Sequence, residues 1–131
     1  MIRIGLKGSA STKVTVENTA AAMGSGTLEV FATPAMIALM ESAACDALKD
    51  ALAAGESTVG TRLEVSHLAA SPIGASAFAE AELIEIDRRK LVFHVTAMDG
   101  SCLIGEGRHE RFLIDAEKFM AKTKARETKQ N

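Results

Sequence analysis

Aromatic residues are scarce in this sequence, which has no tryptophan, no tyrosine and five phenylalanines among 131 residues. Aromatic platforms on which single-stranded nucleic acid stacks are therefore not expected. The net charge of −2 gives no general attraction to nucleic acid or to an anionic membrane. The chain also lacks the ~20 consecutive apolar residues of a membrane-spanning helix and the apolar core of a secretory signal. We expect a soluble, cytoplasmic protein.

Cysteine is also rare, because only Cys45 and Cys102 occur, far apart and each within an apolar run. A free cysteine in such a run usually acts as a small buried hydrophobe. We expect both cysteines to be reduced, buried and structural.

The sequence does contain enough apolar material for one core, with 47% hydrophobic and 24% charged residues. This composition is typical of a globular protein, and the length is that of a single domain. No linker, repeat or low-complexity tract precedes the C-terminal region. We therefore expect one domain over residues 1–131, in which residues 116–131 form a basic and partly helical tail.

The strongest helix signal follows Thr33-Pro34, where a capping hydroxyl precedes proline at the first helical position. Residues 35–52 then contain no glycine or proline, and Gly55 stops the helix. At ~1.5 Å per residue such a helix spans about 27 Å. Its first three turns are apolar on nearly every side, which predicts a helix wrapped by a sheet.

Strand signals, which are β-branched residues or alternation of apolar and polar residues, occur in five segments. These segments are residues 11–17, 61–67, 76–86, 91–97 and 102–114. Asp99-Gly100 is the clearest hairpin signal between them. We predict an α+β fold in which a five-stranded antiparallel sheet wraps around one long central helix, the hotdog arrangement. The exposed edges of such a sheet favour a dimer.

Glu41 and His67 are the two residues whose chemistry conflicts with their surroundings. Glu41 lies in the apolar part of the helix with no cation within a helical turn, so it is either paired in three dimensions or raised in pKa. His67 lies on the strand face that should meet the helix. An imidazole near a carboxylate in a dry groove can polarise or deprotonate water.

Thr33 has two interpretations. As the residue before Pro34 it is a natural N-cap, and as a hydroxyl near a reaction centre it can orient a substrate. Eight helical residues place it ~12 Å from Glu41. A meeting of the two therefore needs a bend at Thr33-Pro34 or a group from a partner subunit.

The other polar residues give weaker signals. We expect His94 to point away from the core, and we expect both His94 and His109 to be solvated. The three histidines and two cysteines have no metal-ligand spacing, so neither a metal site nor a cofactor is expected. The glycines at positions 24–26 and 105–107 do not form a nucleotide loop, and in a strand Gly105 and Gly107 indicate a bulge or a close backbone approach.

The order and spacing of several short motifs resemble the fluoroacetyl-CoA thioesterase-like branch of the hotdog superfamily, from Val14 to about Lys122. The motifs are Val30-Phe31-Ala32-Thr33-Pro34, Leu39-Met40-Glu41, Gly60-Thr61, Val65-Ser66-His67 and Gly107-Arg108-His109-Glu110-Arg111. The resemblance implies a homodimer that hydrolyses acyl-CoA thioesters in two active sites at the subunit interface. It also implies that Thr33, Glu41 and His67 are catalytic.

By the same resemblance Gly60 lines the acyl site and Arg111 lies near the thioester. Thr33 and backbone N–H groups would orient the carbonyl, and His67 would transfer protons. Glu41 would either activate water or attack as a nucleophile to give an anhydride.

The matching stretch of the fluoroacetyl-specific member carries lid aromatics, whereas residues 18–27 here carry alanines, glycines and Met23. We therefore do not expect fluoroacetyl selectivity. We expect a short acyl group, because a charged helix face that crosses the sheet would block a long apolar tunnel. Candidate partners for the CoA phosphates are Arg88, Arg89, Lys90 and the lysines of the tail. Two alternatives are an enoyl-CoA hydratase or dehydratase and a non-catalytic acyl-CoA-binding protein.

Overall fold

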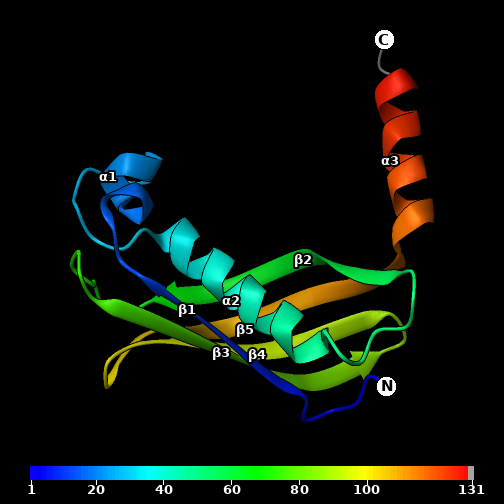
Figure 1. Ribbon diagram of the computed structural model, residues 1–131, viewed down its shortest axis with the longest axis horizontal. Coiled ribbons are helices and arrows are strands. Elements are labelled where there is room, and N and C mark those ends of the chain that lie inside the picture. The colour runs from blue at the N-terminus through cyan, green and yellow to red at the C-terminus, as the bar shows by residue number, and fades with distance from the viewer. Residues whose placement is uncertain (130–131) are drawn as a thin grey trace.

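A computed structural model describes the backbone of residues 1–129 and the side chains of residues 1–126. The elements along the chain are β1 (Lys7–Lys13), the 3-10 helix η1 (Val16–Asn18), α1 (Ala20–Met23), α2 (Thr33–Leu48), β2 (Glu56–His67), β3 (Ser76–Asp87), β4 (Lys90–Asp99), β5 (Cys102–Asp115) and α3 (Ala116–Lys129). The five strands form one antiparallel sheet in the order β1-β3-β4-β5-β2. Helix α2 crosses one face of this sheet (Figure 1). The predicted α+β fold, with a five-stranded antiparallel sheet around one helix, is confirmed.

The core lies between α2 and the inner face of the sheet. Met36 and Met40 of α2 are fully buried, as are Phe93 of β4 and Leu83 of β3. Fully burying side chains of this size contributes about 1.5–3 kcal/mol each. The helix approaches closely because the strands under it carry small residues, and a Cβ at Gly105 would overlap the thioether of Met36. Gly105 therefore marks a close approach, one of the two interpretations that the sequence allowed.

The first strand begins earlier than predicted, at Lys7 instead of residue 11, and ends at Lys13. Its small residues carry little strand propensity, but they allow contact with α2, since a Cβ at Gly8 would overlap the backbone of Ala43 and Ala47. Val14 then leaves the sheet and is buried. The β-branched residues at 14–16, which suggested a strand, instead lead into η1.

Helix α2 ends at Leu48, four residues before the predicted end at Leu52. The chain turns there, and the N–H groups of Ala51 and Leu52 both bond to the carbonyl of Leu48. Leu52 still packs against the core from this turn. Its apolar character extended the helical pattern beyond the helix itself.

The two cysteines are exposed and unpaired, so the prediction that they are buried is wrong. Cys45 lies on the side of α2 that no other element covers, and Cys102 is the first residue of β5, directly after a turn. At the other end of β5, α3 stands away from the sheet (Figure 1). Within residues 1–129 no helix combines the length and the apolar character needed to cross a membrane.

Candidate active site

Thr33 and His67 meet where α2 begins and β2 ends. Thr33 Oγ1 lies 2.7 Å from Nδ1 of His67. The N-cap of α2 is Ala32, which makes no side-chain cap, and Thr33 is the first helical residue. The N-cap interpretation of Thr33 is therefore wrong, and its hydroxyl is directed to the histidine.

His67 occupies a half-buried position that favours its neutral form. Burial lowers the pKa of His67, and an interaction with the backbone of Ala69 offsets this only in part. Among the described residues, none makes a hydrogen bond to the buried Nε2 atom of His67. A neutral imidazole whose Nδ1 contacts a hydroxyl can accept or deliver a proton near pH 7.

A small pocket adjoins this pair, with a volume of about 320 Å³. Its walls are mainly apolar and include Ala20, Val30, Phe31 and Leu68. Ligand sites commonly combine such a lining with a few polar groups at one end. Here the polar side chains of the lining are those of Ser25, Thr33 and His67.

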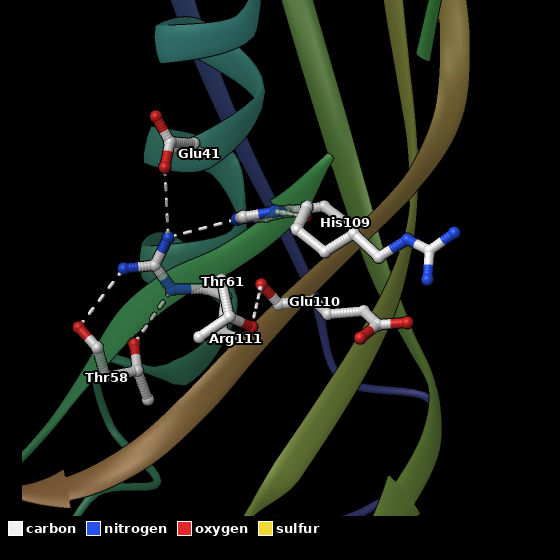
Figure 2. A network of polar contacts seen from close by, with 7 residues as sticks. Glu41, Thr58, Thr61, His109, Glu110 and Arg111 are labelled. Atoms are coloured by element: carbon white, nitrogen blue, oxygen red, sulfur yellow. Dashed lines mark hydrogen bonds and ion pairs between the residues drawn. The ribbon is translucent and has the colours of Figure 1, made fainter. Parts of the chain in front are cut away.

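Glu41 and Arg111 form a second polar centre further along α2. Arg111 Nη1 lies 3.6 Å from Oε2 of Glu41, and the side chains are 8% and 37% exposed, respectively. The sequence left two alternatives for Glu41, an ion-pair partner or a raised pKa, and the structure shows the partner. Figure 2 shows Glu41 on the helix directed at the guanidinium on the sheet.

The guanidinium of Arg111 is held on several sides. Its Nε–H donates to Thr58 Oγ1 at 2.9 Å, and Nη2 donates to the carbonyl of Thr58 at 3.1 Å. Nη1 donates to Nε2 of His109 at 3.0 Å. A fixed guanidinium presents its charge to Glu41 in one geometry.

His109 is fully buried, so the prediction of a solvated histidine is wrong. Its register partners are Leu63 of β2 and Phe93 of β4, which places it on the inner face of β5. The two-residue spacing to Arg111 was the available signal, because residues i and i+2 share a strand face. The glycines of β5 concealed that alternation. His94, in contrast, lies on the outer face as predicted, with Nε2 3.0 Å from Glu106.

Gly60 lies beside the Glu41–Arg111 pair, at a register shift between β2 and β5. A Cβ at this position would come within 2.7 Å of Glu41 Oε2 and 3.3 Å of Arg111 Nη1. Only glycine leaves room for the carboxylate as it stands.

The two centres do not meet within one copy of the chain. Between Glu41 and His67 the described residues show neither a hydrogen bond nor an ion pair. Thr33 and Glu41 lie on one continuous helix, which keeps them ~12 Å apart along its axis. The described part of the chain also has no group of three His, Cys, Asp or Glu residues arranged for a metal ion.

Comparison with known sequences places the chain near one enzyme family. Residues 14–117 match the model of the family described as fluoroacetyl-CoA-specific thioesterase. Over 96 residues the chain is 45% identical to the fluoroacetyl-CoA thioesterase of Streptantibioticus cattleyicolor, a match that covers 73% of this chain and 69% of the relative.

Solved structures agree with this relationship. The fluoroacetyl-CoA thioesterase FlK superposes with a TM-score of 0.89 at 36% identity, over 95% of this chain and 97% of that one. A hypothetical protein of Thermus thermophilus, a thioesterase superfamily member, gives 0.90 at 26% identity over 99% and 96% of the two chains. A hot-dog-like protein from Thermanaerovibrio acidaminovorans, with TM-score 0.85 and 24% identity over 95% and 93%, shares the fold. The chain therefore belongs to the fluoroacetyl-CoA-specific thioesterase family and has the hotdog fold.

Proposed function

We propose that this protein hydrolyses short-chain acyl-CoA thioesters to the free acid and CoA, with Thr33, Glu41 and His67 as its catalytic residues. Family membership makes it a thioester hydrolase. The observation that carries the proposed site is the 2.7 Å contact of Thr33 with His67 beside an apolar pocket. A hydroxyl and a neutral imidazole in the lining of such a pocket suit a substrate with a small acyl group and a polar carbonyl.

The proposed reaction adds water across the carbonyl–sulfur bond. Thr33 orients the carbonyl, and Glu41 either removes a proton from the attacking water or attacks the carbonyl itself to give an anhydride that water then cleaves. In both routes the carbon–sulfur bond breaks and the CoA sulfur leaves. His67 transfers protons during these steps, in keeping with its lowered pKa.

A homodimer with interfacial active sites would bring the two centres together. Helix α2 is continuous from Thr33 through Glu41, so Glu41 reaches His67 most simply from a second copy. The outer edge of β2 has no neighbouring strand among the described residues, whereas Ser9 at the opposite edge donates its N–H to Asp46. An open edge of this kind invites pairing with another chain. Next to Glu41, α2 exposes Ala38 and Cys45, which a partner would cover.

The substrate is proposed to be short because the pocket volume is only about 320 Å³. Its lining contains Ala20 of α1 and Ala69 and Ala70, which follow β2. The absence of aromatics in residues 18–27 argues against selectivity for fluoroacetyl groups.

Arg88, Arg89 and Lys90 surround a surface depression beside Phe112 and are proposed to receive CoA phosphates. No cofactor is proposed. The proposed location is the cytoplasm, because CoA thioesters are found there and cysteines such as these two remain unpaired there.

One assay tests this function against its alternatives. Acetyl-, propionyl-, butyryl- and crotonyl-CoA are incubated with the protein, and both released thiol and ultraviolet absorbance of the enoyl group are followed. Free thiol from the short substrates is the expected result. Loss of the crotonyl double bond without thiol would indicate a hydratase, and binding without either change would indicate an acyl-CoA-binding protein.

A further inference from the structure

His109 is a buried titratable residue that the proposed reaction does not use. It is fully buried on the inner face of β5 and contacts the guanidinium that pairs with Glu41 (Figure 2). A buried polar side chain generally costs free energy unless each polar atom has a partner. Both ring nitrogens of His109 have one.

The two partners fix the protonation state of the ring. Nδ1 lies 2.9 Å from the carbonyl oxygen of Arg62, which can only accept a hydrogen bond, so Nδ1 carries the proton. Nε2 lies 3.0 Å from Nη1 of Arg111, and a guanidinium can only donate, so Nε2 has a free lone pair. The ring is therefore neutral, with its proton on Nδ1.

We propose that His109 is a positioning residue, which acts as an uncharged hydrogen-bond acceptor to aim Arg111 at the carboxylate of Glu41. Nη1 is the atom that touches both His109 and Glu41, so the bond to the imidazole fixes the direction of the nitrogen that faces the carboxylate. Thr58 holds Nε and Nη2 on the opposite edge of the planar guanidinium, so His109 is the partner that holds the edge facing Glu41. This role rests on the proposed function of Glu41.

The surroundings of His109 support an uncharged ring. Burial lowers the pKa of His109 most strongly, and the charge of Arg111 lowers it further. The carboxylates of Glu41 on α2 and Glu110 on β5, together with the carbonyl of Arg62 on β2, act in the opposite direction. From β4 the group facing the ring is Phe93, whose ring centroid lies 6.4 Å away.

The test is a double-mutant cycle on thiol release, with His109→Leu, Arg111→Met and the double variant. We expect His109→Leu to lower kcat roughly ten- to a hundredfold, as when a hydrogen bond to a charged group is lost, with a smaller effect on KM. In the Arg111→Met background the same change should alter kcat less than about twofold, because its target is absent. His109→Gln, which keeps an acceptor, should recover most of the activity. His94→Leu on the outer face is the matched control and should leave kcat unchanged.

Independent effects of the two substitutions would overturn the proposal. A second readout does not depend on activity. The chain has only three histidines, so ¹⁵N spectra of the rings can be assigned by single substitutions. At pH 7 one ring should be neutral with its proton on Nδ1, and its signals should vanish in His109→Gln. A charged ring, or a proton on Nε2, would disprove the positioning role even if the protein shows no thioesterase activity.

Discussion

The hydroxyl of Thr33 contacts Nδ1 of His67 at 2.7 Å, although the two residues lie 34 positions apart in the sequence. This contact joins the first turn of the central helix to the last residue of an edge strand. The Thr33 hydroxyl therefore belongs to the lining of the pocket and does not cap the helix.

Thr33→Val should separate these two roles, because valine keeps the shape of threonine and removes the hydroxyl. We expect thiol release to fall by roughly ten- to a hundredfold as the positioned polar group is lost. The melting temperature should reflect only the loss of the exposed hydrogen bond to His67, since no capping bond is removed. Thr33→Ser should retain most activity. A clear drop in melting temperature with normal turnover would restore the N-cap interpretation.

Glu41→Gln and His67→Ala should each lower thiol release by at least roughly a hundredfold, as expected when an acid–base group is removed. Rates are compared at saturating acyl-CoA after circular dichroism has shown that both variants fold. Glu64→Gln, at an exposed position on β2, is a control for the loss of one carboxylate. Wild-type rates in the Glu41 or His67 variant would remove that residue from the mechanism.

Two inactive variants should regain activity when their subunits are mixed. If Thr33 and His67 of one subunit work with Glu41 of the other, a Thr33→Val/Glu41→Gln heterodimer contains one intact site. Random exchange of subunits should then restore about a quarter of wild-type activity. The variants are unfolded and refolded together, and thiol release is measured against separately refolded controls. No recovery despite heterodimer formation would place all three groups in one subunit.

Gly60→Ala should impair turnover without strain in the backbone. The added methyl would stand 2.7 Å from Glu41 Oε2, so the carboxylate must move away from Arg111. We expect kcat to fall at least roughly tenfold, as when a charged hydrogen-bonding geometry is lost. Adding Glu41→Asp, which withdraws the carboxylate by one methylene, should recover part of that loss. Equal rates in the wild type and Gly60→Ala would show that the carboxylate position is unimportant.

Acidification below pH 6.5 should destabilise the protein before its carboxylates titrate. The pKa values of His67 and His109 are both lowered from the ordinary value of 6.5, with burial as the largest cause. As pH falls through 6.5, the unfolded chain binds protons that the folded chain does not, so stability is lost over the interval down to the folded pKa values. Melting temperatures measured from pH 8 to about pH 5 should therefore fall, and less steeply in His109→Gln. Parallel curves would mean that His109 titrates alike in both states.

The sequence predicted the elements best where periodicity and turn chemistry agree. The segments at 76–86 and 91–97 became β3 and β4, and the alternation of Ala79, Ala81 and Leu83 marked the buried face correctly. The hairpin indicated by Asp99-Gly100 is present, although Asp99 still belongs to β4 and the turn consists of Gly100, at φ 60°, and Ser101. Strand β1 was misplaced because its glycine, serines and alanine satisfy close packing with a helix, a tertiary requirement that local propensity does not express.

For the candidate site too, local features were predicted correctly, whereas contacts between distant segments were not. Glu41 stood out as a charge on an apolar helix, and its need for a partner was correctly inferred. The identity of that partner depends on register across two strands, which brings Arg111 opposite Gly60. His109 was missed because the glycines of β5 hid which face it occupies. Cys45 was misjudged for a related reason, since an apolar run does not reveal which side of a helix stays uncovered.

Because α2 carries both Thr33 and Glu41 without interruption, it fixes the distance and the angle between these two side chains. Inserting one residue between them would swing Glu41 by about 100° around the axis and push it ~1.5 Å further along. The carboxylate would then face away from β5. Homologues that share this mechanism should therefore keep the number of residues between Thr33 and Glu41 constant, even where the exposed residues between them differ.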